Sequence, residues 1–134
     1  MVLQESESLM VNLCAGWTLF FAGIVAGAVA GVFFHKNEWL GGYTSWRRRM
    51  VRLGHVAFFG IGLINVAFGL TVQSVDIEAS QVPVSSWLLI AGGIGMPAVC
   101  YLSAWRKGFR HSFFVPVLCV GLGVGLFLWR LLEL

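Results

Sequence analysis

Histidine is the residue of this chain best suited to ligand chemistry, and the sequence has three of them. His35 closes the first apolar run, His55 lies about one turn inside the second, and His111 opens the fourth. Imidazole is a common axial ligand of haem iron and a common ligand of other transition metals. We therefore take His55 and His111 as candidate haem or metal ligands, with His35 as a weaker third candidate.

The residues that follow two of these histidines repeat one spacing. Phe58, Gly62, Asn65 and Gly69 follow His55 at offsets of 3, 7, 10 and 14, and Phe114, Leu118, Gly121 and Gly125 follow His111 at the same offsets. Such offsets place each set on one face of an α-helix. If both faces point inward, the glycines leave room for a flat macrocycle, and the pattern predicts a b-type haem between two helices of a bundle.

A second interpretation of the same residues needs no cofactor. Basic side chains precede His55 and His111, and they are Arg47, Arg48, Arg49, Arg52, Arg106, Lys107 and Arg110. Lys and Arg beside a membrane span attract anionic lipids, and a histidine at the interface reaches water with its polar tip. This interpretation predicts that the basic residues bind anionic lipid at the cytoplasmic face.

The composition indicates the solvent in which these residues must be placed. The 134 residues allow one domain, 58% of them are hydrophobic, and only 11% are charged, against about 25% in soluble domains. The net charge of +3 does not indicate a nucleic-acid partner, because the basic residues lie between apolar runs and form no separate basic domain. The spacing of Cys14, Cys100 and Cys119 matches no metal motif, so we interpret them as small apolar residues.

Four apolar runs are long enough to cross a bilayer, which takes about 20 helical residues. They predict transmembrane helices at about 13–34, 53–72, 84–105 and 111–132. Barrel strands would alternate apolar and polar residues in segments of about ten, which these runs do not. The predicted fold is therefore all-α, a single transmembrane domain that forms an integral membrane four-helix bundle of two hairpins.

The charges of the loops predict the orientation of this bundle. The loops around 35–52 and 106–110 hold eight of the nine Lys and Arg residues. Five of the six acids lie in the other extramembrane segments, and they are Glu5, Glu7, Asp76, Glu78 and Glu133. By the positive-inside rule both basic loops face the cytoplasm and both termini the other side. We expect the protein in the bacterial inner (cytoplasmic) membrane.

Small residues within the runs indicate where helices pack. Gly23, Gly27 and Gly31 recur every four residues in the first run, and Gly121 and Gly125 do so in the fourth. Such spacing lets two helix backbones approach closely, either within the bundle or against another subunit. Asn65 is expected to bond a neighbouring helix, although with the proline at position 97 it could also line a pore.

The functional prediction follows from what the sequence lacks as well as from what it has. The sequence contains no recognisable catalytic motif, and its loops are too short to build an independent active site. We expect a non-catalytic subunit or accessory factor of a larger membrane assembly, with other subunits or further copies of the chain as partners. The alternatives are a b-type haem-binding electron carrier and a small oligomeric channel or carrier.

Overall fold

The fold consists of four long helices in a computed structural model that describes the backbone of residues 2–75, 77 and 79–134 and the side chains of 10–75, 77 and 80–134. The long helices are α1 (Val2–Phe34), α2 (Trp46–Ser74), α3 (Pro83–Trp105) and α4 (Phe114–Leu132). Short 3-10 segments lie between them: η1 (Trp39–Gly41), η2 (Ala79–Gln81) and η3 (Lys107–Ser112). The described residues contain no strand, which confirms the all-α prediction.

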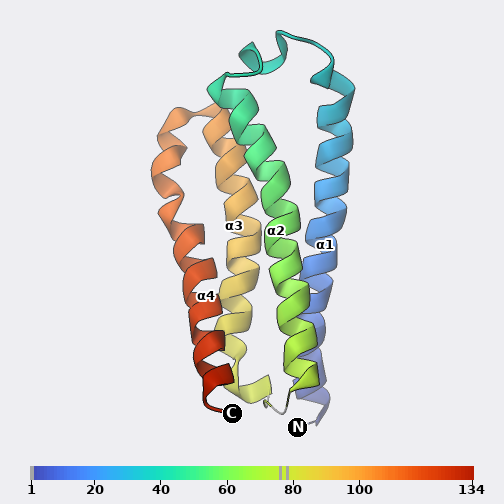
Figure 1. The fold of residues 1–134 in the computed structure, drawn as a ribbon, viewed down its shortest axis with the longest axis vertical. Helices are drawn as coiled ribbons and strands as arrows, with labels where there is room; N and C mark the ends of the chain where they lie inside the picture. Colours follow the sequence, from blue (N-terminus) through green and yellow to red (C-terminus); the bar gives the residue numbers. More distant parts are fainter. Residues whose placement is uncertain (1, 76, 78) are drawn as a thin grey trace.

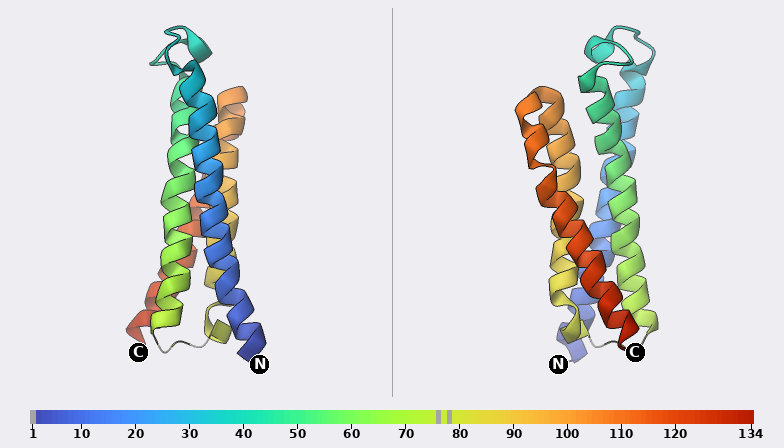
Figure 2. Two further views of the ribbon diagram at one scale, coloured as in Figure 1. Left: turned by 90° about the vertical axis from the view of Figure 1, so that its right-hand side faces the viewer. Right: turned by 60° about the vertical axis from the view of Figure 1, so that its left-hand side comes forward.

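Neighbouring helices along the chain are antiparallel and pack against each other, α1 on α2, α2 on α3 and α3 on α4 (Figure 1). α1 also touches α3, whereas α1 and α4 do not pack extensively in the described chain. The loops after α1 and α3 lie at one end of the bundle, and both termini lie at the other (Figures 1 and 2). All eight basic residues of the two loops therefore share one end, which we call the basic end.

All four helices are long and apolar enough to cross a membrane. Their burial differs, since 11% of an apolar 18-residue stretch is buried in α1 and in the span that contains α4, against 39% in α2 and 33% in α3. The two inner helices supply most of the core, and the outer two present apolar side chains to the surroundings. Such a surface resembles that of membrane helices, which present apolar side chains to lipid tails that are as apolar as leucine.

Two helices begin earlier than their apolar runs. α1 starts at Val2 and not near residue 13, because the Gln and Glu residues between these two positions are good helix formers. α2 starts at Trp46 and not near residue 53, because Ser45 caps it. The Ser45 side chain accepts a hydrogen bond from the backbone N–H of Arg48, so the arginine-rich segment is helical.

The fourth helix begins later than predicted, which corrects the position of one candidate ligand. α4 starts at Phe114, and His111 lies before it in the 3-10 segment η3. Pro116 occupies the first turn of α4, where its missing N–H costs nothing. His111 therefore does not head a helical face as the spacing suggested.

Of the acids used for orientation, Asp76, Glu78 and the side chains of Glu5 and Glu7 lie outside the described residues.

A buried polar cluster joins the first three helices. The Asn12 amide of α1 donates to the Asn65 side-chain oxygen of α2 at 2.8 Å, and the Ser86 hydroxyl of α3 donates to Asn12. The Asn65 amide in turn donates to the backbone carbonyls of Ile61 and Leu89 at 3.0 and 3.2 Å. In a membrane interior every polar group needs such a partner, so the cluster fixes the mutual register of the three helices.

Candidate functional site

The first helix packs on the second through glycines that admit the side chains of α2. A Cβ on Gly23 would lie 2.8 Å from the Phe59 ring, and one on Gly16 would lie 2.5 Å from Val66. Gly27 admits His55, whose imidazole carbon Cε1 would be 2.5 Å from such a Cβ. Gly31 has open space beside it. The predicted packing face thus contacts α2 through Gly23 and Gly27. Gly16 lies seven residues before Gly23 and extends this contact face along α1.

His55 is accordingly turned toward α1. Its ring is half-buried and meets the Phe59 ring edge-on, with ring centres 5.3 Å apart. Its Nδ1 atom is buried without a hydrogen-bond partner. The face below it also turns inward, because Gly62 lies against the backbone of Gly16 and Asn65 reaches α1 and α3.

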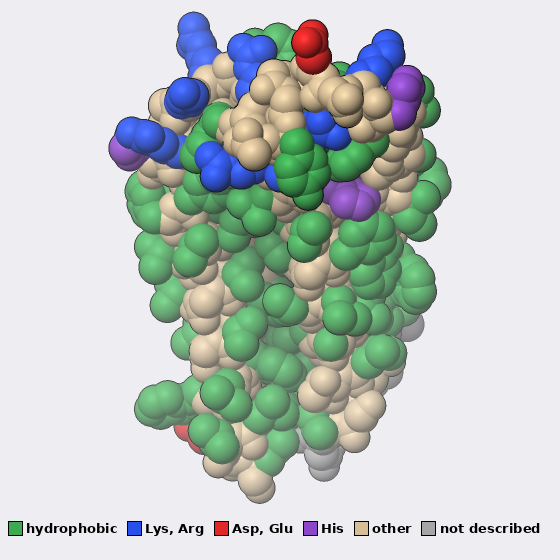
Figure 3. Space-filling model, turned by 45° about the horizontal axis from the view of Figure 1, so that its top comes forward, with side chains coloured by type: hydrophobic (Ala, Val, Ile, Leu, Met, Phe, Trp, Pro, Cys, Tyr) green, Lys and Arg blue, Asp and Glu red, His purple; other side chains and the backbone are tan. Residues whose placement is uncertain are grey.

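The other two histidines lie elsewhere. His35 is exposed just after α1, and His111 is exposed in η3, where Arg110 donates to its Nε2 at 3.3 Å. The face predicted below His111 points outward, because Phe114 and Leu118 are 63% and 54% exposed. Figure 3 shows the three histidine side chains at separate places around the basic end. The structure therefore does not bring His55 and His111 together.

This arrangement does not fit a haem held by two imidazoles. The His55 ring packs against Gly27 and Phe59 of its own helix pair, and the glycines of α4 that were to make room for a macrocycle lie on an outward face. Within the described residues, no three His, Cys, Asp or Glu side chains are grouped so that they could hold a metal ion. The residues present therefore favour neither kind of site.

Arg48 has a structural role that the sequence prediction of lipid binding missed. Its side chain is only 4% exposed, and it donates to the backbone carbonyls of Phe34 at 3.0 Å and Asn37 at 3.4 Å. Its guanidinium also stacks over the rings of Phe34 and Tyr43, at 4.5 and 5.5 Å from their centres. Arg48 thus satisfies a carbonyl at the end of α1 and cannot reach a lipid phosphate.

Arg52 is partly engaged in the same loop. It donates to the Tyr43 carbonyl at 3.3 Å and stacks on the Tyr43 ring at 4.3 Å. With His55, Gly31 and Phe34 it lines a cavity of about 350 Å³ between α1 and α2. This cavity is mostly apolar, and Arg52 is its only charged side chain.

Four other cations of the predicted lipid-binding set are free for an external partner. The side chains of Arg47, Arg49, Arg106 and Lys107 are exposed and make no hydrogen bond or ion pair within the described chain. The one ion pair among described residues joins Arg130 and Glu133 at the opposite end, at 2.7 Å. There the hydrogen bonds from Trp129 and Arg130 lower the pKa of the Glu133 carboxyl. The charge of the basic end is therefore not neutralised by described carboxylates (Figure 3).

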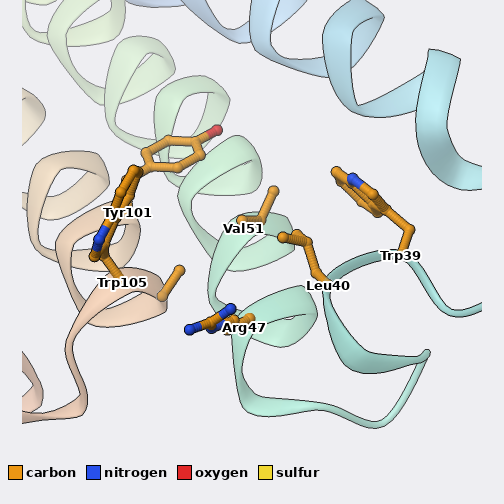
Figure 4. Close-up of a pocket in the computed structure, with 7 residues that line it drawn as sticks. Trp39, Leu40, Arg47, Val51, Tyr101 and Trp105 are labelled. Carbon is orange, nitrogen blue, oxygen red and sulfur yellow. The ribbon is translucent and has the colours of Figure 1, made fainter.

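A pocket at the basic end lies between α2, α3 and the loop after α1, with a cavity of about 590 Å³ (Figure 4). We call it the α2–α3 pocket, and it is lined by Trp39, Leu40, Arg47, Val51, Tyr101, Ala104 and Trp105. Its only charged side chain is Arg47. An apolar pocket with one cation at its rim suits an amphiphile with an anionic group.

A second, shallower hollow adjoins this pocket. It has a volume of about 600 Å³ and is lined by Leu40, Gly41, Ser45, Trp46, Arg47 and Lys107. Arg47 and Leu40 line both spaces, so the two lie next to each other. Lys107 comes from η3 and Arg47 from α2, which places two cations from distant parts of the sequence at one hollow. Sequence spacing gave no sign of this pairing, because only the packing of α2 on α3 creates it.

No protein-family model, curated protein or solved structure matches this chain. Its function must therefore be inferred from its own residues.

Proposed function

We propose that this chain is a small integral membrane protein that acts as a non-catalytic subunit or accessory factor of a larger membrane assembly, with its basic end in the cytoplasm. Both termini then lie on the other side of what we take to be a bacterial inner membrane. The orientation rests on the distribution of Lys and Arg, which is the charge rule that sets topology.

The observation that carries the proposal is the outer face of α4. Gly123 faces α3, where a Cβ would lie 3.1 Å from Leu89. Gly121 and Gly125, two residues before and after it, lie on the other side of the helix, and no described residue comes within 4 Å of a Cβ placed there. Glycines four apart allow close helix–helix approach, and this pair is unused within the chain.

The interior supports an accessory role better than a transport role. Asn65, the polar residue that could have lined a pore, is fully engaged with Asn12, Ile61 and Leu89. A substrate path through the bundle would need polar groups free to exchange partners. This cluster instead fills the space between three helices.

The proposal is tested by measuring the assembly in native membranes. Membranes carrying the tagged chain are solubilised in mild detergent, and its apparent mass is read by native electrophoresis, with a second tag to detect copies of itself. We expect a stable assembly that is weakened several-fold by Gly121→Leu with Gly125→Leu, because the added side chains separate the helices. Val124→Leu, on the same helix, is the control and should leave it intact. A single chain of unchanged mass in all three samples contradicts the proposal.

A further inference from the structure

The cations at the rim of the α2–α3 pocket are arranged for an anion that the chain does not supply. Arg47 and Lys107 both line the shallow hollow, and neither side chain has a partner among the described residues. Glu38 is the only described acid at the basic end, and it forms no ion pair. Two unpaired cations from separate elements at one hollow favour a phosphate, whose oxygens accept from both.

The pocket beside these cations is built for an apolar chain. Val51, Ala104 and the ring of Tyr101 line it, and Trp105 stands at its edge with 85% of its surface exposed (Figure 4). Tryptophan and tyrosine are enriched where membrane helices meet the headgroup region. A ligand that occupies both spaces therefore combines an anionic head with a hydrocarbon tail.

The wall between the two spaces is held in place by specific contacts. Leu40 lines both of them and adopts a left-handed backbone with φ of 55°, which costs a non-glycine residue about 1–3 kcal/mol. The Ser45 hydroxyl donates to the Leu40 carbonyl at 2.7 Å, and the Trp46 indole donates to the Ser103 carbonyl of α3 at 2.8 Å. These bonds fix the loop to α2 and α2 to α3, so both spaces are preformed.

We propose that this is a binding site for an anionic phospholipid, with the headgroup phosphate between Arg47 and Lys107 and an acyl chain in the α2–α3 pocket. The site lies at the end of four helices of membrane-spanning length. In a membrane, lipids with an anionic head and an apolar tail would therefore always surround it. The proposal goes beyond the accessory role and does not depend on it, since a lipid can bind whether or not the chain has protein partners.

The test is a lipid titration of the purified protein followed by native mass spectrometry. Phosphatidylglycerol and phosphatidylcholine are compared for the wild type, for Arg47→Gln with Lys107→Gln, and for the control pair Arg49→Gln with Arg106→Gln. The control removes the same charge from the same end, but neither of its residues lines either space. We expect the site variant to bind phosphatidylglycerol about 25-fold more weakly, from about fivefold per cation, and the control to change by less than about threefold.

Two further arms separate the head from the tail. Trp105→Ala should weaken binding about fivefold, because it removes apolar contact with the acyl chain. Trp87 is also an exposed tryptophan of the same helix, and Trp87→Ala should not weaken binding. Both tryptophans are too exposed for their loss to unfold the chain. Soluble glycerol phosphate should compete poorly, because it lacks the acyl chain.

Four results overturn the proposal. Equal weakening of both charge pairs would mean diffuse attraction to the whole basic end. Equal binding of phosphatidylglycerol and phosphatidylcholine by the wild type would mean that no anionic headgroup is recognised. Competition by glycerol phosphate as strong as that by the lipid, or unchanged binding by Trp105→Ala, would mean that the acyl chain does not occupy the pocket.

Discussion

At the scale of single residues, neighbouring arginines of one run have different roles. Arg47, Arg48 and Arg49 are consecutive in the sequence and identical in chemistry, yet Arg48 is buried and the other two are exposed. The difference arises from helix geometry, because consecutive residues are about 100° apart around α2 and only one can point at the end of α1. Composition alone assigns all three to the membrane surface.

Replacing Arg48 should therefore destabilise the fold, whereas replacing Arg49 should not. Arg48→Met leaves the Phe34 and Asn37 carbonyls without their donor and removes the stacking on Phe34, for a loss of about 2–4 kcal/mol. Arg48→Lys keeps the charge but not the fork of donors, so it should restore only part of the loss. Arg49→Met is the control, and thermal unfolding in detergent is the measurement. Equal midpoints for the two Met variants would show that Arg48 has no such structural role.

The glycines of α1 provide a second comparison at this scale. Gly27→Ala places a Cβ 2.5 Å from the His55 ring, which must then shift from its present contact with Phe59, and we expect a loss of about 1–3 kcal/mol. Gly31→Ala meets open space and should be neutral or slightly stabilising, since alanine favours a helix. Unfolding of the two variants under the same conditions decides the matter, and equal stability would mean that α1 and α2 are packed less closely than described here.

At the scale of elements, the polar cluster of Asn12, Asn65 and Ser86 couples the first three helices. A double-mutant cycle with Asn12→Leu and Asn65→Leu should give a coupling free energy of about 0.6–1.7 kcal/mol, the range found for polar pairs between membrane helices. The paired variant should be less destabilised than the sum of the single ones, because each single change takes from the other asparagine the one hydrogen bond that joins the two side chains. Strict additivity would show that the two side chains do not interact.

The spacing rule for helical faces worked for one helix and not for another. The face of His55, Gly62 and Asn65 turns into the bundle, which was one condition of the haem hypothesis. The matching offsets after His111 do not form one inward face, because His111 precedes α4 and Phe114 and Leu118 point outward. Periodicity identifies residues that share a face, but it does not say which neighbour the face meets.

At the scale of the whole molecule, the proposed orientation can be tested directly. In a background with Cys14, Cys100 and Cys119 replaced by alanine, a membrane-impermeant maleimide should label Gln81→Cys in intact cells. It should label Arg49→Cys only after the membrane is permeabilised. Both positions are exposed at opposite ends of the bundle, so access reflects the side of the membrane. The reverse labelling pattern would place the basic end outside.

The sequence by itself determined the number of long helices, their apolar character and the gathering of basic residues in two loops, because these follow from run length and composition. It also indicated the close approach of α1 through Gly23 and Gly27, although not the partner helix. Only the tertiary structure decided that Arg48 is buried, that His55 and His111 lie apart, and that Arg47 meets Lys107 beside an apolar pocket. These outcomes depend on how each helix is rotated about its axis and which helix lies next to it, and both are set by packing between segments far apart in the chain.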